Sequence, residues 1–396
     1  MTTLLKNGIL LQNGAETRCD ILVEDDCICE ICAPGELPSP EKTVDLTGLY
    51  ISAGFLDMHV HGGDGCDFMD GTPEAFHRAS ALHLKHGTTA MLPTTLASDT
   101  AELEKVLKLF CECKNAFSDG AKLLGVHIEG PYLSPKQSGA QDPRFIRPPQ
   151  KQEYLHLLDI CPDILRWTIA PELNGADEMA QQLCRHGVLP SIGHSDATGE
   201  QVLAAMENGF RHITHLYSAT SSIIRINGFR HIGIIESAYL FDGLTSEVIA
   251  DGCHLPKHLL QMAYRFIGPD RLALVTDAMR AAGQTEGESI LGSLSNGQRV
   301  ILEDGVAKMP DRTAFAGSIC TADRLVRTMH TLAEVPLADA VKMMTETPAR
   351  ILGLEKEYGL LVPGRKADLV IFDRNVTIKA VLKNGAVCFA DGLNIQ

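Results

Sequence analysis

Two histidines one residue apart follow a short apolar run early in the chain. Residues 54–63 read Gly-Phe-Leu-Asp-Met-His-Val-His-Gly-Gly, which places the two imidazoles at His59 and His61. Residues two apart on a β-strand point to the same side, so both side chains can face one centre. Imidazole is a common ligand of divalent metal ions. The type and the spacing of these residues therefore indicate a metal site.

Four later segments repeat this layout, because each is an apolar run that ends in a ligand or an acid. The residues at their ends are Glu129, His194, His215 and Asp277. A catalytic metal site typically combines three imidazole or carboxylate ligands with an open position for water. We predict such a site from Glu129, His194 and His215, and a second ion held by His59 and His61 near Glu129.

Asp277 differs from the predicted ligands in the chemistry that we expect of it. It follows the apolar run 272–276 and precedes Ala278 and Met279. A carboxylate at a strand end can take a proton from metal-bound water and pass it to a leaving amine. We therefore predict Asp277 as the general base.

The elements around these residues alternate between strand-like runs and amphipathic helices, which is typical of a parallel sheet. Helical spacing covers residues 73–86, 101–110, 199–206, 323–329 and 337–344. In a (β/α)8 barrel the C-terminal ends of the strands converge on one site. The predicted fold class is therefore α/β, with a TIM-like catalytic barrel over residues 53–354. Residues 134–149 show no periodicity and are predicted to form a long active-site loop.

The two ends of the chain resemble each other. Residues 4–11 and 381–388 each contain an Asn-Gly pair between apolar residues, at Asn7–Gly8 and Asn384–Gly385. This pair is a strong signal for the turn of a β-hairpin. We predict that residues 1–52 and 355–396 form one small β-sandwich domain, with the barrel inserted between its halves.

Composition excludes several classes of partner. The chain has 396 residues, of which 45% are hydrophobic and 21% charged, as in an ordinary globular protein with an ample core. Its net charge of −15 argues against nucleic acid or an anionic membrane as the main partner.

The twelve cysteines are scattered without a Cys-x-x-Cys pair, which favours free thiols in a reducing cytoplasm. Neither a signal peptide nor a bilayer-spanning apolar run is expected, so we predict a cytoplasmic protein.

Six segments, taken together and in order, resemble the N-acetylglucosamine-6-phosphate deacetylases of the amidohydrolase superfamily. They are residues 59–63, 127–132, 193–195, 214–217, 249–254 and 275–279. Residues 347–354 and 364–370 fit the same family, so the resemblance covers nearly the whole chain. It implies a (β/α)8 barrel with a small β-sandwich, usually as a homodimer. It also implies removal of the acetyl group from an N-acetylamino-sugar 6-phosphate by a metal-activated water.

The resemblance also implies a role for each matching residue. Glu129, His194 and His215 match the main metal ligands, His59 and His61 match a second-metal pair that some members lack, and Asp277 matches the catalytic acid and base. His254 and Arg230 match residues that reach the substrate phosphate, in part across the dimer interface. Ser218 and Ala219 lie in the segment beside the sugar and its phosphate.

The chain departs from the family pattern around the sugar. Gln141 stands where members usually have a histidine that helps hold the acetyl carbonyl. A glutamine amide can donate a hydrogen bond, but it cannot become cationic. Ser218 and Thr220 replace the usual Asn and Met, and Arg225 competes with Arg230 as the phosphate arginine. The chemistry is expected to be retained in an altered sugar pocket.

Two other functions compete with this one. A related cyclic-amide hydrolase, such as a dihydroorotase-like enzyme, would bridge two metals with a modified lysine at a later strand end, where this chain has no matching lysine. A non-catalytic sugar-phosphate sensor would keep the barrel without turnover, and only the departures at Gln141, Ser218 and Thr220 favour it. The expected cofactor is a divalent ion, zinc before iron or manganese, with one or two per subunit.

Overall fold

Eight parallel strands form the ring that carries the predicted ligands. The computed structural model describes residues 2–37, 40 and 42–395. The strands follow one another around the ring as β6 (Phe55–Val60), β9 (Thr88–Thr95), β11 (Val126–Glu129), β12 (Ile164–Ile169), β13 (Leu189–Ile192), β14 (His212–Ile213), β17 (Thr245–Ile249) and β18 (Leu272–Val275). The ring closes between β18 and β6, where the Asp277 amide donates to the His59 carbonyl at 2.9 Å. These strands are almost wholly buried, as expected for a parallel sheet that is covered on its outer face.

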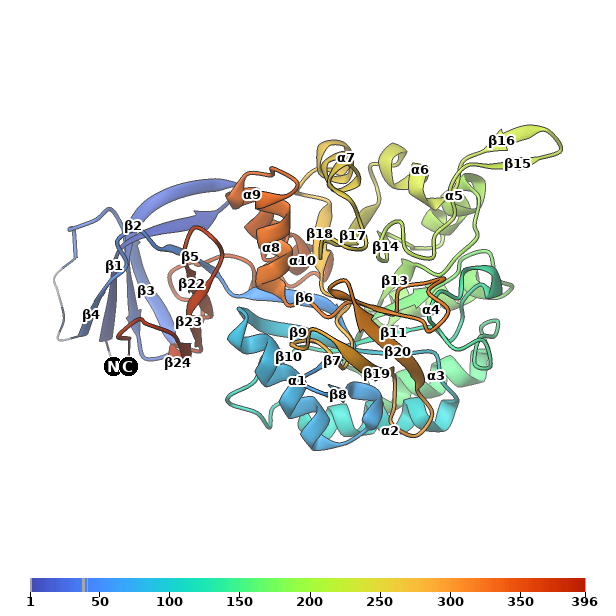
Figure 1. Ribbon diagram of the computed structural model, residues 1–396, viewed down its shortest axis with the longest axis horizontal. Helices are drawn as coiled ribbons and strands as arrows, with labels where there is room; N and C mark the ends of the chain where they lie inside the picture. Colours follow the sequence, from blue (N-terminus) through green and yellow to red (C-terminus); the bar gives the residue numbers. More distant parts are fainter. Residues whose placement is uncertain (1, 38–39, 41, 396) are drawn as a thin grey trace.

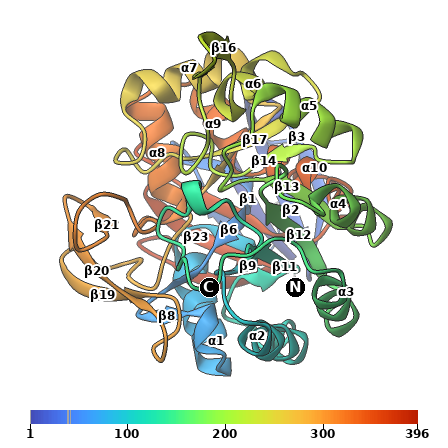
Figure 2. The ribbon, with the colours of Figure 1, turned by 90° about the vertical axis from the view of Figure 1, so that its right-hand side faces the viewer.

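Helices surround the ring, and Figure 2 looks along it. They are α1 (Pro73–Lys85), α2 (Thr100–Cys113), α3 (Lys151–Ile160), α4 (Ala176–Arg185), α5 (Gly199–Glu207), α6 (Ile234–Leu240), α7 (Lys257–Ile267), α8 (Ala322–Thr331), α9 (Leu337–Lys342) and α10 (Glu346–Ile351). The five predicted helices are confirmed, as α1, α2, α5, α8 and α9. Thr72, Asp99 and Thr198 begin three of them, because each side chain accepts a hydrogen bond from a free amide of the first turn.

The chain ends build a smaller β-domain beside the barrel, and Figure 1 shows both termini in it. Its strands are β1 (Thr2–Gln12), β2 (Ala15–Glu24), β3 (Cys27–Cys32), β4 (Lys42–Asp45), β5 (Tyr50–Ala53), β22 (Leu369–Phe372), β23 (Ile378–Lys383) and β24 (Ala386–Ala390). They form one sheet in which β5 pairs with β22, so both halves share one apolar core. The predicted fold class is confirmed. We propose residues 1–52 and 355–396 as the limits of this domain and 53–354 as those of the barrel.

One of the two predicted Asn-Gly hairpin turns is confirmed, and the other is wrong. Asn384–Gly385 joins β23 to β24. Asn7–Gly8 instead lies inside β1, where the register with β2 shifts. The backbone N–H of Asn7 donates to Asp20 Oδ1 at 2.7 Å. The turn between β1 and β2 is Asn13–Gly14, where both residues have positive φ. β1 runs past Gly8 because its second half also pairs with β5.

Short elements extend the loops of the barrel. They are β7 (Gly62–Gly63), β8 (Cys66–Asp67), η1 (Phe68–Asp70), β10 (Lys122–Leu123), η2 (Pro135–Gln137), β15 (Ile224–Ile226), β16 (Phe229–His231), β19 (Gly287–Leu291), β20 (Gln298–Glu303) and β21 (Val306–Lys308). The β15–β16 hairpin projects from the barrel at the end away from the small domain (Figure 1). Strands β19–β21 form a separate sheet beside the ring (Figure 2).

The cysteines and the lengths of the helices can be read from the structure. All twelve cysteines are free. Within residues 2–37, 40 and 42–395, the helices are too short or too polar to cross a membrane.

Candidate metal centre and active site

The predicted ligands meet at the C-terminal ends of the ring strands. Glu129 is the last residue of β11, and His194, His215 and Asp277 each lie two residues beyond a strand end. These three residues have positive φ values of 47°, 27° and 46°. Non-glycine residues rarely adopt this conformation, and it concentrates where function fixes a side chain. Here the chain turns sharply after each strand, at the point where the side chain must face the mouth of the ring.

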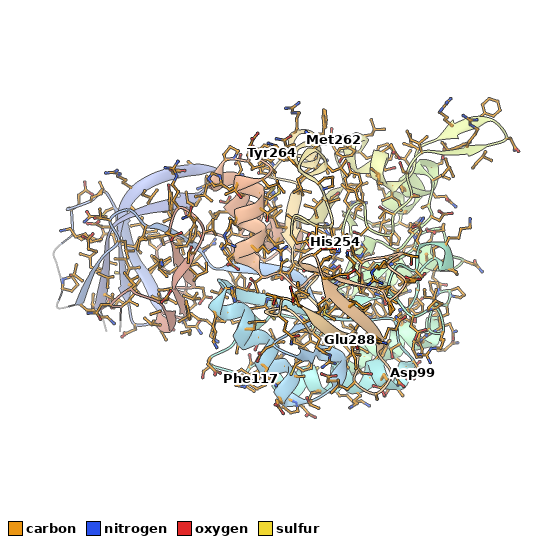
Figure 3. All side chains as sticks on the ribbon, in the orientation of Figure 1. Asp99, Phe117, His254, Met262, Tyr264 and Glu288 are labelled. Atoms are coloured by element: carbon orange, nitrogen blue, oxygen red, sulfur yellow. The ribbon has the colours of Figure 1, made fainter. Side chains whose placement is uncertain are left out.

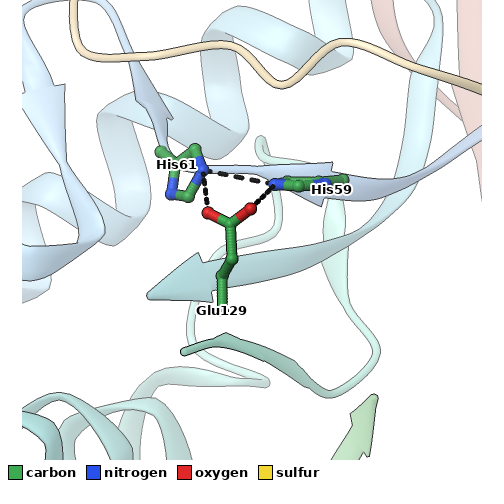
Figure 4. Close-up of side chains that lie close together, drawn as sticks. All are labelled: His59, His61 and Glu129. Atoms are coloured by element: carbon green, nitrogen blue, oxygen red, sulfur yellow. Dashed lines mark hydrogen bonds and ion pairs between the residues drawn. The ribbon is translucent and has the colours of Figure 1, made fainter. Parts of the chain in front are cut away.

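Glu129 stands at the centre of the group. Its Oε1 lies 3.0 Å from His215 Nε2 and 3.2 Å from His194 Nε2. Figure 4 shows the same carboxylate facing His59 and His61, with distances of 3.5 Å from Oε1 to His59 Nε2 and 3.3 Å from Oε2 to His61 Nε2. Two groups of ligand atoms, each within 4.8 Å of one another, therefore share Glu129. Both are buried, and each offers the mixed nitrogen and oxygen donors of a transition-metal site.

The hydrogen bonds of His194 and His215 show that this donor set fits a cation. Nδ1 of His194 lies 2.9 Å from the Gln137 carbonyl oxygen, and Nδ1 of His215 lies 3.1 Å from that of Ser218. A carbonyl oxygen only accepts, so each Nδ1 carries the proton. With a single proton on the ring, Nε2 is an acceptor, and it faces a Glu129 oxygen, which is also an acceptor. Acceptors that face each other need a cation or an extra proton between them, and a bound divalent ion satisfies that need.

The second histidine pair has the same arrangement. Nδ1 of His59 lies 2.9 Å from Glu247 Oε1, and Nδ1 of His61 lies 3.3 Å from the Thr94 carbonyl oxygen. The two Nε2 atoms are 3.3 Å apart and face carboxylates. Burial lowers the pKa of His59, yet the carboxylates of Asp277 and Glu129 raise it to about 9. In the absence of a metal ion, the surroundings therefore favour an extra proton on the imidazole, in the place of a cation.

Asp277 faces this second pair from the end of β18. Its Oδ1 lies 3.1 Å from His61 Nε2 and 3.4 Å from His59 Nε2. Its backbone is fixed on both sides, by the bond to His59 and by the Ser318 amide, which donates to the Asp277 carbonyl at 2.8 Å. Burial raises the pKa of Asp277, but the two imidazoles lower it further, and the balance lies below the ordinary value. The group is therefore an ionised carboxylate at neutral pH, able to accept a proton.

A cavity of about 290 Å³ opens above these residues. Its lining is His61, Leu96, Glu129, Gly139, Ala140, Gln141, His194, His215, Tyr217, Ser218, Ala219, His254, Asp277, Leu291, Ala314, Phe315 and Gly317. Four of the five predicted substrate residues, namely Gln141, Ser218, Ala219 and His254, therefore line one cavity. Arg230 does not line it. It lies on β16 opposite Arg225 of β15, exposed on the projecting hairpin, and its substrate role stays a prediction.

Gln141 is fixed at both ends of its amide. Nε2 donates to Glu129 Oε2 at 2.7 Å, and Oε1 accepts from the Ala97 amide at 2.8 Å. The residue is buried in the predicted long loop, whose one regular element is the short helix η2. This loop therefore places the neutral amide donor of Gln141 in a hydrogen bond with the Glu129 carboxylate.

His254 is held from behind by a carboxylate. Its Nδ1 lies 2.9 Å from Asp251 Oδ2, and its ring meets Phe315 edge-on at 4.9 Å between centroids. In Figure 3 the residue lies inward of Met262 and Tyr264, which mark the outer helix α7. The arrangement fixes the ring through Nδ1 and leaves Nε2 unpaired with Asp251, in a residue that lines the cavity.

Several residues close to the site could not be predicted from the sequence alone. Leu291 and Phe315 reach the cavity from the β19–β21 region, whose position over the ring has no local signal. Arg166 and Glu247 form a fully buried ion pair beneath the ligands. A charged residue in the middle of a short apolar strand is a signal that could have found both.

Comparisons with known proteins agree with this geometry. Residues 50–388 match the Amidohydrolase family. The chain is 33% identical over 392 residues to an N-acetylglucosamine-6-phosphate deacetylase of Lysinibacillus sphaericus, covering 98% of each chain. It is 30% identical over 349 residues to an N-acetylgalactosamine-6-phosphate deacetylase of Escherichia coli O157:H7, covering 88% of this chain and 90% of the relative.

The fold of the chain is also similar to that of a solved structure. It is an N-acetyl-D-glucosamine-6-phosphate deacetylase of Mycobacterium smegmatis, with one aspartate replaced by alanine, in complex with N-acetyl-D-glucosamine-6-phosphate. The TM-score is 0.90 at 29% identity, over 98% of this chain and all of the other. We conclude that the chain belongs to the N-acetylglucosamine-6-phosphate deacetylase family of the amidohydrolases.

Proposed function

We propose that the protein is a metal-dependent hydrolase that removes the acetyl group from an N-acetylhexosamine 6-phosphate, with N-acetylglucosamine 6-phosphate as its preferred substrate. The products are the amino-sugar phosphate and acetate. The observation that carries the proposal is the convergence of Glu129, Asp277, His61, His194 and His215 at one cavity, with His59 buried next to them. The relatives with matching names support the substrate class.

The proposed cofactor is zinc, bound as one or two ions. Glu129, His194 and His215 would hold the first ion, and His59 and His61 would hold the second with Glu129. When bound, such an ion polarises a carbonyl oxygen and lowers the pKa of a water molecule. Mixed imidazole and carboxylate donors suit zinc, and iron and manganese are the other candidates.

The residues of the chain supply the proton transfers. Asp277 would take a proton from the attacking water, whose oxygen bonds to the acyl carbon, and would deliver it to the departing amine nitrogen as the carbon–nitrogen bond breaks. The amide of Gln141 carries two hydrogens, one of which is directed to Glu129. The other can donate to the acyl oxygen, where negative charge develops in the transition state.

The far end of the cavity is proposed to hold the sugar phosphate. His254 can donate to a phosphate oxygen, and Ser218 and Ala219 line the wall beside it. We propose that Arg230 reaches the phosphate from the second subunit of a homodimer, since its own hairpin projects away from the barrel. Twelve free thiols suit a reducing compartment, so the cytoplasm is the proposed location.

N-acetylgalactosamine 6-phosphate is the second candidate substrate. The deacetylase of that sugar from Escherichia coli is 30% identical to this chain, close to the 33% of the Lysinibacillus sphaericus enzyme. The competing cyclic-amide hydrolase loses support, because no lysine lines the cavity among the residues that the structure describes. The competing sensor does not explain an ionised carboxylate at the position of the base.

Acetate release from four sugars tests the substrate assignment. We expect kcat/KM for the 6-phosphates of N-acetylglucosamine and N-acetylgalactosamine to exceed that of each free sugar by at least about 100-fold, since charge-assisted contacts with the phosphate contribute about 3 kcal/mol. His254→Ala should remove much of this preference and leave the rate on free sugars nearly unchanged. His156→Ala on the exposed face of α3 is the control. Equal hydrolysis of free and phosphorylated sugars would refute the phosphate assignment.

Substitution of Gln141 tests the acyl-oxygen contact. Gln141→Leu keeps the size of the side chain but removes the donor, and we expect kcat to fall roughly 10²-fold, as for other oxyanion donors. Gln141→His restores the usual family residue and should raise activity on N-acetylglucosamine 6-phosphate. Gln261→Leu on α7, outside the cavity, is the control. If Gln141→His abolishes activity, the loop is shaped for a different acyl sugar.

A further inference from the structure

A fully buried ion pair lies beneath the proposed metal centre. Arg166 of β12 and Glu247 of β17 are both 0% exposed, and Nη1 lies 2.6 Å from Oε2. A buried pair loses the hydration of two charges, and apolar side chains of similar volume would fill the space without that loss. Packing alone therefore does not explain the pair.

Every N–H of the Arg166 guanidinium has an acceptor. Nε donates to Ser191 Oγ at 3.1 Å. Nη1 donates to the Met58 carbonyl at 3.2 Å and to Glu247 Oε2, and Nη2 donates to Thr214 Oγ1 at 2.8 Å and to Glu247 Oε1 at 2.9 Å. These five acceptor atoms belong to four residues, which lie on or just after four different strands. The planar fork is therefore fixed, and it holds both oxygens of Glu247 in one orientation.

The remaining lone pairs of Glu247 face three histidines of the neighbouring strands. Its Oε1 lies 2.9 Å from His59 Nδ1 and accepts from the His215 backbone amide at 3.2 Å, while Oε2 lies 3.2 Å from His212 Nε2. Two N–H groups of Arg166 donate to the two oxygens of Glu247, which is the pairing geometry of an ionised carboxylate. An ionised carboxylate only accepts, so His59 must present Nδ1–H to it.

We propose that Glu247 is a positioning residue of the metal centre. It fixes the tautomer and the ring orientation of His59, so that Nε2 faces Glu129 and Asp277. It also holds the backbone at His215 and so connects a ligand from each of the two proposed ion sites. This inference rests on the proposed function.

Arg166 explains how the Glu247 carboxylate can accept the His59 hydrogen bond at a site buried from water. A lone carboxylate at such a depth would be a buried charge without a partner, which is costly. The guanidinium keeps the carboxylate ionised and makes the pair neutral as a whole. His59 therefore gains an oriented acceptor, while the metal centre gains no net negative charge from below.

The chain offers a matched control for a purely structural role. Asp323 is another buried carboxylate, and it faces an imidazole and an arginine through His86 Nδ1 at 3.1 Å and Arg327 Nη2 at 2.9 Å. It lies at the start of α8 and does not line the cavity. Asp323→Asn therefore removes a buried charge of the same kind without touching a proposed ligand.

The test is zinc affinity of the full chain, freed of metal and titrated against a competing chelating dye. Glu247→Gln is expected to weaken zinc binding about 10–100-fold, the usual effect of losing the partner that orients a metal-binding histidine. Asp323→Asn is expected to bind zinc as the wild type does, even where both variants lose thermal stability. Wild-type zinc affinity in Glu247→Gln would overturn the proposal.

A second variant keeps the proposal testable if Glu247→Gln fails to fold. Arg166→Lys keeps the charge, but one ammonium group cannot hold both carboxylate oxygens, so zinc affinity should fall several-fold in a folded protein. Unchanged affinity in this variant would also overturn the proposal. The proposed function fails separately, if the wild type binds no zinc or releases no acetate.

Discussion

Asp277→Asn is expected to lower turnover by roughly 10²–10⁴-fold while metal content stays near that of the wild type. Asparagine has the same shape, so the backbone bonds that join Asp277 to His59 and Ser318 remain. Its amide cannot accept the proton of the attacking water or return it to the amine. The loss should therefore appear in kcat, and the protein should still bind its substrate.

Two measurements together decide the role of Asp277. Steady-state acetate release gives the rate, and elemental analysis of the same sample gives the metal content. Asp64→Asn is the control, since this aspartate pairs with Arg78 at the surface. Near-normal turnover would exclude Asp277 as the base. Loss of metal together with activity would instead make Asp277 a ligand, which its 3.1 Å approach to His61 Nε2 makes a real alternative.

Glu129→Gln is expected to empty the centre and abolish activity. The carboxylate is common to both proposed ion sites, so a neutral amide in its place weakens metal binding at both. After dialysis, the metal content should fall from that of the wild type to near zero. Full retention of metal would remove Glu129 from the ligand set.

The thermal stability of metal-free protein provides a second readout for Glu129→Gln. In the metal-free wild type, Glu129 Oε1 faces the Nε2 lone pairs of His194 and His215. An amide NH2 at that position can donate to them, which removes the unfavourable contact. This gain offsets the loss of the contact between the Glu129 carboxylate and protonated His59, so the metal-free variant should melt within about 4 °C of the metal-free wild type. A large drop in Tm would mean that Glu129 supports the fold rather than the metal.

That these residues converge at one site could be predicted, because each carries a local signal. Each of Glu129, His194, His215 and Asp277 ends an apolar strand, and the geometry of a parallel barrel brings strand ends together. The distances among them still depend on the turn after each strand, where positive φ values appear at three of the four. No sequence rule assigns that backbone conformation to histidine or aspartate.

The contacts that could not be predicted depend on partners far along the chain. Asn7–Gly8 has the same dipeptide as a hairpin turn, but pairing of β1 with β5 keeps the strand extended through it. Arg166 and Glu247 are 81 residues apart, and either one alone reads as an isolated charge in a strand. The same holds for Phe315, whose approach to His254 depends on how residues 285–315 fold back over the ring.

The small β-domain has a consequence for synthesis on the ribosome, because β5 needs a partner from the other end of the chain. β5 ends at Ala53, and its neighbour β22 begins at Leu369. At typical translation rates, roughly 15–60 s pass between the emergence of these two residues. During that interval β5 has an open edge, which another nascent chain could pair with. The N-terminal strands β1–β5 must therefore stay unaggregated until β22 has been made. We expect chaperones to bind the nascent chain mainly at these strands.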